Sequence, residues 1–125
     1  MLSLLSARGG PWAVIRTFSK AYGLSGARIG YAITGNRNLA VGFSKVRIGF
    51  NVNRIALAGA CAAMRDQSYL EMVLGTVSCE RQRLSIALQN YGLRVYPSAA
   101  NFLLARTNSP SDAIATKLAE RHILV

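Results

Sequence analysis

The sequence predicts an α/β fold, because short β-favouring runs alternate with helical segments along a chain of 125 residues. An apolar stripe at helical spacing runs from Tyr69 to Tyr91, and at the standard rise this helix would be roughly 34 Å long. Such a helix is long for one small domain and suits a connection between two lobes. Two sets of strands flank it, and neither could form a whole sheet. We therefore expect part of a larger α/β protein.

Before the long helix, the sequence predicts the end of a helix, two strands and two helices. Glycine and proline at 9–11 end the first helix, which covers about 1–8. β-branched and aromatic residues predict strands over 13–18 and 29–34, separated by a loop rich in glycine and serine. Asn36 and Asn53 each stand where an N-cap is needed for a following helix. The second of these helices is rich in alanine, which indicates close packing against another element.

From the long helix onward, the boundaries are marked by capping and turn residues. Ser68 and Glu71 have the spacing of a capping box, and Gly92 stands where a left-handed residue would end the helix. The remaining predicted elements are a strand over 93–96, a strand over 101–106, a helix capped by Ser109 with Pro110 as its first residue, and a strand beginning at 123–125.

The balance between basic and acidic residues limits the classes of partner that this chain could bind. Basic residues number 15 and acidic residues 5, so the net charge is +10. Such a balance can indicate nucleic acid or an anionic surface as partner. The basic residues are scattered, however, without a run of four and without interleaved aromatic residues. The pattern therefore disfavours nucleic-acid binding and indicates a surface whose acidic complement is missing or lies elsewhere.

The cysteines and the hydropathy pattern indicate in which cellular compartment the protein is expected. Cys61 and Cys79 fall in helical segments without metal-ligand spacing, so we expect buried, reduced thiols and no metal site. The N-terminus lacks the basic start and cleavage site of a signal peptide, and no stretch is long enough to span a bilayer. We expect a cytoplasmic protein without a membrane partner.

The candidate catalytic and binding residues lie in and beside the loop between the first two predicted strands. Lys20 is one of three lysines in a chain that otherwise uses arginine, and a lysine amine can form a Schiff base with a carbonyl group. Arg28 follows eight residues later and can bind a phosphate in a forked geometry. Thr17 and Ser19 add hydroxyl donors. This set suits a phosphorylated aldehyde such as pyridoxal phosphate, although the spacing alone also fits an ordinary surface loop.

The segment SKAYGLSGARIGY, from Ser19 to Tyr31, resembles the cofactor-lysine segment of fold-type I pyridoxal-phosphate aminotransferases. It is most similar to the histidinol-phosphate aminotransferase group, and the resemblance covers roughly 13–125. Further matching segments are Phe50–Asn53, Glu80–Leu84, Pro97–Leu104 and His122–Val125. The resemblance implies a partial PLP-dependent transferase fold. In it, 1–80 would be the late part of the large cofactor-binding domain and 81–125 the early part of the small C-terminal domain.

The resemblance also implies roles for individual residues. Lys20 would form the internal aldimine with pyridoxal 5′-phosphate and then move the proton between the substrate Cα and the cofactor C4′. Arg28 would bind the cofactor phosphate, with Thr17 and Ser19 as hydroxyl donors. The parent reaction would use L-histidinol phosphate as amino donor and 2-oxoglutarate as the 2-oxo acid, giving imidazole-acetol phosphate and L-glutamate in histidine biosynthesis. The enzyme would be a homodimer.

Other parts of the family's site are expected outside these residues. The residues that hold the pyridine ring would precede residue 1, and the arginine that grips the substrate carboxylate would follow Val125. Asn51 and Asn53 would face the active site or the dimer partner. The alternatives are a truncated, inactive copy, an aromatic aminotransferase, a phosphothreonine decarboxylase-like enzyme, and a basic binding module, which the scattered charge disfavours.

Overall fold

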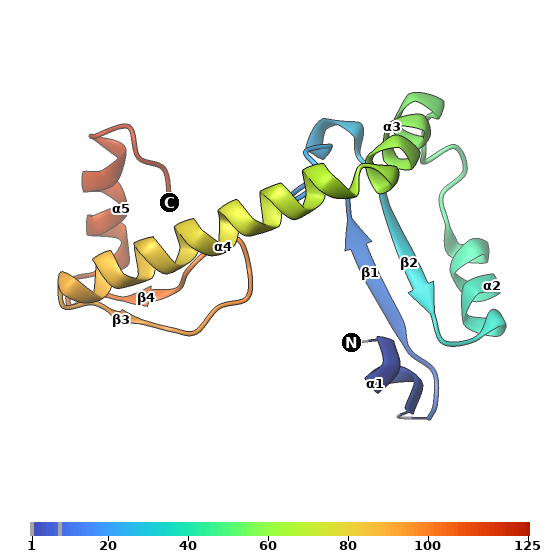
Figure 1. Ribbon diagram of the computed structural model, residues 1–125, viewed down its shortest axis with the longest axis horizontal. Coiled ribbons are helices and arrows are strands. Elements are labelled where there is room, and N and C mark those ends of the chain that lie inside the picture. The colour runs from blue at the N-terminus through green and yellow to red at the C-terminus, as the bar shows by residue number, and fades with distance from the viewer. Residues whose placement is uncertain (1, 8) are drawn as a thin grey trace. The chain divides into compact units, whose positions relative to one another are not determined.

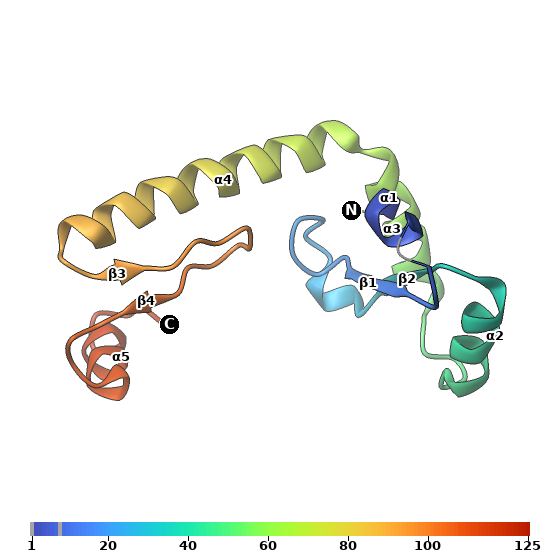
Figure 2. The same ribbon diagram turned by 90° about the horizontal axis from the view of Figure 1, so that it is seen from below.

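The structure is a computed structural model that describes residues 2–7 and 9–125. The chain divides into two compact units, Met1–Glu71 and Met72–Val125 (Figure 1, Figure 2). The helix α4 (Gln67–Asn90) begins in unit 1 and continues into unit 2. The long helix predicted from the apolar stripe is therefore confirmed, with both ends within two residues of the prediction.

Unit 1 is built around a β-hairpin. Its elements are α1 (Leu2–Ala7), β1 (Ala13–Thr17), the short 3-10 helix η1 (Ser25–Ala27), β2 (Gly30–Thr34), α2 (Arg37–Val46) and α3 (Arg54–Arg65). The two strands lie side by side and are antiparallel, with Ile15 opposite Ala32 (Figure 1). Both predicted strands are confirmed, and the helix predicted over 1–8 is seen as α1, with residues 1 and 8 outside the described part.

The described residues bury four apolar side chains: Phe18, Ile29, Ala56 and Ala60. The first two stand just outside the strand ladder, one at each end of the connecting loop, and the Phe18 amide donates to the Ile29 carbonyl at 3.2 Å. The two alanines lie four residues apart on one face of α3. Because they are small, α3 can lie directly against the base of the loop, as its alanine-rich sequence predicts.

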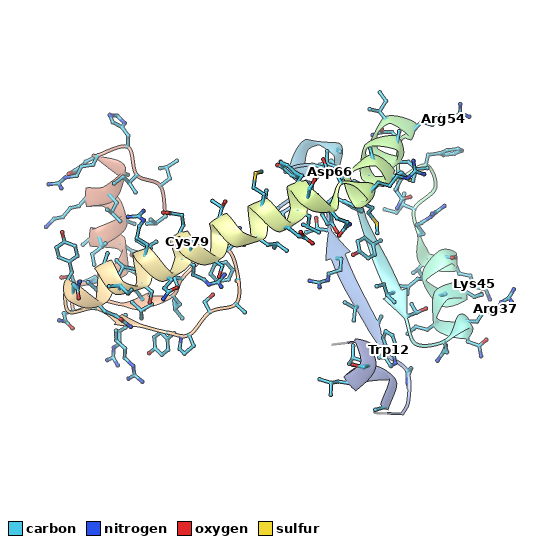
Figure 3. The ribbon with its side chains drawn as sticks, viewed as in Figure 1. Trp12, Arg37, Lys45, Arg54, Asp66 and Cys79 are labelled. Carbon is cyan, nitrogen blue, oxygen red and sulfur yellow. The ribbon has the colours of Figure 1, made fainter. Side chains whose placement is uncertain are left out.

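Three helices begin at side-chain caps. Asn36 Oδ1 accepts from the Leu39 amide at 2.8 Å, and Asn53 Oδ1 accepts from the Ala56 amide at 2.7 Å, which confirms both predicted caps. The capping box predicted at Ser68 is wrong. Asp66, labelled in Figure 3, accepts from the Tyr69 amide at 3.1 Å, so its carboxylate fills the cap role and the helix starts earlier, at Gln67.

The cap of α3 leads to a first prediction. Replacing Asn53 by alanine should lower the free energy of unfolding of unit 1 by about 1 kcal/mol, because the Ala56 amide loses its acceptor. The matched control is Asn38→Ala, at an exposed position inside α2. Urea denaturation followed by circular dichroism measures both changes. Equal losses in the two variants would contradict the capping role.

Unit 2 contains the rest of α4 together with β3 (Arg94–Val95), β4 (Ala105–Arg106) and α5 (Ser111–Ala119). The two short strands pair antiparallel. The end of α4 follows the prediction: Gly92 has φ +79°, and the Leu93 amide donates back to the Leu88 carbonyl at 3.1 Å.

Three predictions for unit 2 are wrong: the start of one strand, the cap of one helix and a final strand. The strand predicted over 101–106 is shorter, because Ser98 Oγ donates to the Phe102 carbonyl at 2.7 Å and holds the start of this run in a turn. Ser109 does not cap α5, since Pro110 occupies the N-cap position and Ser111 is the first helical residue. Within the described residues, 123–125 form no strand.

The two cysteines are exposed and free, so the prediction that they are buried is wrong (Cys79 is labelled in Figure 3). The physical reason is that α3 buries only its two alanines in the described core and α4 buries no residue there. In residues 2–7 and 9–125, no helix combines the length and apolar character needed to cross a membrane.

Candidate functional site

The candidate site is the loop that joins β1 to β2, residues 18–29, called the lysine loop below. Its first residue, Phe18, is 3% exposed and anchors the loop. The Phe18 ring packs against Tyr22 and Tyr31, with centroids 4.8 and 5.5 Å away. The Leu24 amide donates to the Phe18 carbonyl at 2.9 Å, so the chain folds back over this anchor. Lys20 therefore lies two residues after Phe18, whose position the packing and this hydrogen bond hold in place.

Two residues with positive φ, Gly23 and Arg28, shape the part of the lysine loop that follows Lys20. Gly23 has φ +69°, and its amide donates to the Lys20 carbonyl at 2.9 Å, which closes a turn on the lysine. Arg28 has φ +53°, in the left-handed region that residues with a Cβ seldom adopt. The Arg28 side chain also bonds locally, since Nη1 donates to the Ser25 carbonyl at 2.7 Å. The loop therefore holds Arg28 in a defined, strained conformation.

The hydroxyl groups predicted as donors meet at the end of β1. Thr17 Oγ1 donates to Ser19 Oγ at 2.8 Å and accepts from the Ser19 amide at 3.0 Å. Ser19 is half-buried, whereas Thr17 and Lys20 are exposed. Within residues 2–7 and 9–125, no carboxylate forms an ion pair with Lys20. The Lys20 amine and the Ser19 hydroxyl, which Thr17 holds in place, are therefore available to a ligand at the same end of the strand.

All four predicted site residues belong to this one loop and its entry. The structure brings Thr17 and Ser19 into contact; Arg28 bonds to Ser25 rather than to either hydroxyl. Lys20 and Arg28 are both cationic, and no acidic residue precedes Asp66 in the sequence. Such a site attracts anions. An amine suited to a carbonyl, in a loop that also carries hydroxyl and guanidinium donors suited to a phosphate, fits pyridoxal phosphate.

Two further features of the site come from tertiary structure. Tyr69, at the start of α4, places its hydroxyl 3.4 Å from where a Cβ at Gly23 would lie, and the sequence carries no signal for this contact. A groove of about 610 Å³ runs between the lysine loop and α3, with Leu24, Ala27 and Asn53 among its lining residues. Asn53 uses Oδ1 to cap α3, and its Nδ2 donor group remains for a ligand.

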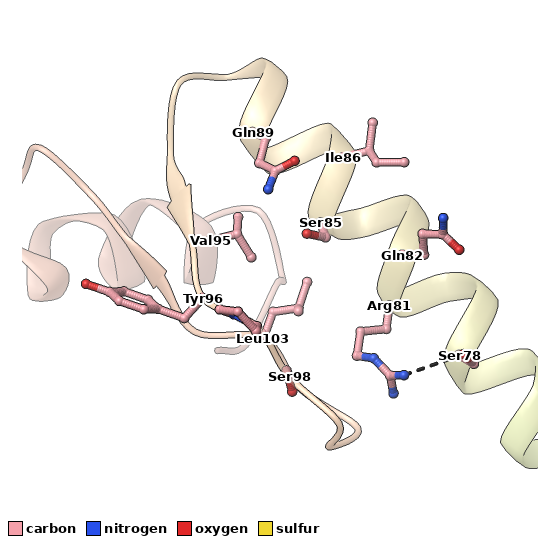
Figure 4. A pocket seen from close by; sticks show the side chains of 11 residues that line it. Ser78, Arg81, Gln82, Ser85, Ile86, Gln89, Val95, Tyr96, Ser98 and Leu103 are labelled. Atoms are coloured by element: carbon pink, nitrogen blue, oxygen red, sulfur yellow. Dashed lines mark hydrogen bonds between the residues drawn. The ribbon is translucent and has the colours of Figure 1, made fainter.

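Unit 2 has a groove of its own, of about 360 Å³, between α4 on one side and β3 with the turn that follows it on the other (Figure 4). Its lining includes Arg81, Ser85 and Leu103 but no lysine, histidine, cysteine or carboxylate. Arg81 donates to the Ala100 carbonyl at 2.9 Å and so holds the turn at 98–102 against the helix. Among the residues that the structure describes, no group of three His, Cys, Asp or Glu side chains could hold a metal ion. The lysine loop is therefore the better candidate for chemistry.

Known proteins resemble this chain along nearly its whole length. The family described as aminotransferase class I and II matches residues 3–125. Histidinol-phosphate aminotransferase 1 of Mesorhizobium japonicum is 40% identical over 121 residues, which are 97% of this chain and 33% of that protein. Histidinol-phosphate aminotransferase 2 of Caulobacter vibrioides is 37% identical over 123 residues, 98% of this chain and 32% of that protein.

Solved structures agree with the sequence relatives. Histidinol-phosphate aminotransferase from Sinorhizobium meliloti, crystallised in complex with pyridoxal-5′-phosphate, superposes with a TM-score of 0.81 at 39% identity, over 90% of this chain and 32% of that one. A putative histidinol-phosphate aminotransferase from Erwinia carotovora gives a TM-score of 0.89 at 25% identity, over 100% of this chain and 36% of that one.

The chain spans about a third of the length of the curated relatives it matches. Its mixed strands and helices are accordingly a part of the PLP-dependent transferase fold, as the sequence predicts. With the family match extending over residues 3–125, this chain belongs to the class I and II aminotransferase family.

Proposed function

We propose that this chain carries the cofactor lysine of an aminotransferase that uses pyridoxal 5′-phosphate, L-histidinol phosphate and 2-oxoglutarate. The observation that carries the proposal is the lysine loop, in which Lys20 stands beside the bonded hydroxyls of Thr17 and Ser19. The Sinorhizobium meliloti relative, whose crystals contain pyridoxal-5′-phosphate, supports the choice of cofactor. The relatives named histidinol-phosphate aminotransferase support the choice of substrate.

Pyridoxal phosphate supplies an electron-withdrawing ring that makes the hydrogen on the substrate Cα acidic. Lys20 Nζ would hold the cofactor through its carbonyl carbon. When the substrate amine takes that place, Nζ would be free to move the proton between the substrate Cα and the cofactor C4′. A positioned acid–base group of this kind contributes about 10²- to 10⁴-fold to a rate.

The hydrogen bonds already present leave the right donors for a phosphate. Thr17 donates its hydroxyl hydrogen to Ser19 Oγ, so the Ser19 hydroxyl keeps its own hydrogen for an oxygen of the ligand. Arg28 uses Nη1 for the Ser25 carbonyl, which leaves Nη2 and Nε as a pair of donors. In this proposal, Ser19 and Arg28 bind the phosphate and Thr17 orients Ser19.

The proposal includes an assignment of domains and assembly. Residues 1–80 are part of a large cofactor-binding domain and 81–125 part of a small domain, in a cytoplasmic homodimer. The division of the chain into two compact units within α4 supports two domains joined by that helix.

The test places these 125 residues in a complete enzyme. In a chimera, they replace the matched third of the Sinorhizobium meliloti aminotransferase, and transamination between histidinol phosphate and 2-oxoglutarate is measured. We expect turnover by the chimera and none by the isolated chain, because substrate orientation needs groups beyond these residues. A folded, cofactor-loaded chimera that turns over only aromatic amino acids would contradict the substrate. Turnover by the isolated chain would contradict the incomplete site.

A further inference from the structure

The backbone turn from Lys20 to Gly23 sets the point from which the amine of the candidate site extends. The Gly23 amide donates to the Lys20 carbonyl at 2.9 Å and closes this turn. Because the Lys20 side chain is exposed, the turn beneath it matters more for its position than side-chain packing does. A group that moves a proton must be placed closely, since an error of about 1 Å can cost about 100-fold in rate. Contacts that hold this turn therefore bear on the chemistry of Lys20.

Two contacts hold the turn against the core of unit 1. Tyr22, inside the turn, packs its ring against that of Phe18, with the centroids 4.8 Å apart. Leu24, just after the turn, reaches α3, where one of its methyl carbons lies 3.9 Å from where a Cβ at Gly59 would lie. Gly23 stands between Tyr22 and Leu24 and brings no side chain of its own to the core. Its position therefore depends on what packs against its backbone.

Tyr69, the third residue of α4, packs against Gly23. Its hydroxyl oxygen lies 3.4 Å from where a Cβ at Gly23 would lie. In residues 2–7 and 9–125, no other atom outside Gly23 and its two chain neighbours lies within 4 Å of that place. Gly23 has φ +69°, a conformation that favours glycine, so the hydroxyl meets the bare side of this residue. Tyr69 therefore covers the residue that closes the turn on Lys20.

Tyr69 is itself held by the junction between α3 and α4. Asp66, the single residue between these helices, accepts from the Tyr69 amide at 3.1 Å and from the Ser68 hydroxyl at 3.0 Å (Figure 3). The Asp66 amide donates to the Ala62 carbonyl at 3.2 Å and so ties the junction to the end of α3. The lysine loop packs on α3 through its own core contacts. One element thus supports both Gly23 and the residue that covers it.

We propose that Tyr69 is a positioning residue for Lys20, which acts by holding the Lys20–Gly23 turn in place. Its hydroxyl packs on Gly23 and keeps the Gly23 amide on the Lys20 carbonyl, and this fixes where the lysine side chain begins. Tyr69 acts through the turn and does not touch the substrate. This inference rests on the proposed function, because it gives Tyr69 a role only through Lys20.

The first test is hydrogen exchange in the full 125-residue chain, without cofactor. Tyr69→Ala should raise the exchange rate of the Gly23 amide at least about tenfold, while the Leu24 amide, bonded to the Phe18 carbonyl, changes less than about threefold. Tyr69→Phe loses the contacts of one atom and should raise the Gly23 rate about two- to threefold. Equal increases at both amides would show a general loss of structure and overturn the positioning role, as would an unchanged Gly23 rate in both variants.

The second test measures a single turnover of the cofactor-loaded chimera with saturating histidinol phosphate. Tyr69→Ala should lower the first-order rate constant about 10- to 100-fold, because the amine is misplaced. The half-saturating substrate concentration should stay the same within a factor of about two, as for a residue outside the substrate contacts. Loss of folded protein would reduce the amplitude and leave the rate constant unchanged, and this result would overturn the proposal. Slowing by deuterium on the substrate Cα confirms that proton transfer is being measured.

Tyr91 provides the matched control, since it is a tyrosine just beyond the other end of α4 and is 84% exposed. Tyr91→Ala should leave the exchange rates and the single-turnover rate constant within a factor of about two of wild type. A Tyr91→Ala effect equal to that of Tyr69→Ala would overturn the proposal.

The Lys20→Ala chimera separates this inference from the proposed function. If Lys20→Ala abolishes turnover while Tyr69→Ala keeps the wild-type rate constant, the inference about Tyr69 fails and the proposed function stands. If Lys20→Ala keeps the wild-type rate constant, the proposed function fails and the role of Tyr69 fails with it.

Discussion

Replacing Lys20 by alanine in the chimera is expected to lower kcat for transamination by about 10²- to 10⁴-fold or more. The variant loses the amine that holds the cofactor and the group that carries the proton to and from the substrate Cα. The lysine loop should remain folded, because its anchor is Phe18 and the Lys20 side chain is exposed. Steady-state kinetics with histidinol phosphate and 2-oxoglutarate measure the loss.

The chain supplies two matched controls for this substitution. Lys45 on α2 and Lys117 on α5 are the other lysines, and both are exposed. Lys45→Ala and Lys117→Ala should leave kcat unchanged within a factor of about two, since surface substitutions outside a site have small effects. A Lys20→Ala chimera with the activity of these controls would remove Lys20 from the mechanism.

Replacing Phe18 by alanine is expected to lower the free energy of unfolding by about 3–5 kcal/mol, the usual range for a buried phenylalanine. Phe18 is 3% exposed and contacts Tyr22 and Tyr31 in a core with few other buried residues, so the lysine loop should lose its order. Urea denaturation gives the free energy, and hydrogen exchange at the Leu24 amide reports on the loop, because this amide donates to the Phe18 carbonyl.

Phe50 provides the matched control for the Phe18 substitution. It is fully exposed, so Phe50→Ala should change the free energy of unfolding by no more than about 0.5 kcal/mol. Phe50 also has φ +57°, a conformation that favours glycine, so Phe50→Gly should leave stability equal or slightly raised. Equal losses for Phe18→Ala and Phe50→Ala would show that Phe18 does not anchor the loop.

Local interactions account for the parts of the fold that the sequence predicts well. Asn36 and Asn53 cap helices through bonds to amides three residues away, so the signal lies within four residues of sequence. The same locality explains the end of α4 at Gly92. The error at Ser68 arises because Asp66, two residues earlier, can also cap the helix, and its carboxylate accepts the hydrogen bond from the Tyr69 amide.

Burial was harder to predict, because it depends on contacts between elements. The exposure of Cys61 and Cys79 follows from the direction in which α3 and α4 turn their side chains, and hydropathy alone does not reveal that direction. The strand expected from residue 101 is interrupted by the bond from Ser98 to the Phe102 carbonyl, a contact that propensity does not encode.

The candidate site likewise has features that the sequence predicts and features that only the structure shows. Thr17, Ser19, Lys20 and Arg28 lie within twelve consecutive positions, so the sequence alone presents them as one group. The Thr17–Ser19 hydrogen bond and the left-handed backbone of Arg28 emerge only with the structure. The approach of Tyr69 to Gly23 joins residues far apart in the chain and carries no sequence signal.

The most direct test of the central claim is to find which lysine binds pyridoxal phosphate. The 125-residue chain is incubated with the cofactor, reduced with borohydride to fix the bond, digested and sequenced by mass spectrometry. The account predicts a pyridoxyl group on Lys20 in clear preference to Lys45 and Lys117, and its disappearance in Lys20→Arg. Equal labelling of the three lysines, or labelling at Lys45 or Lys117 alone, would contradict the claim that the lysine loop is the cofactor site.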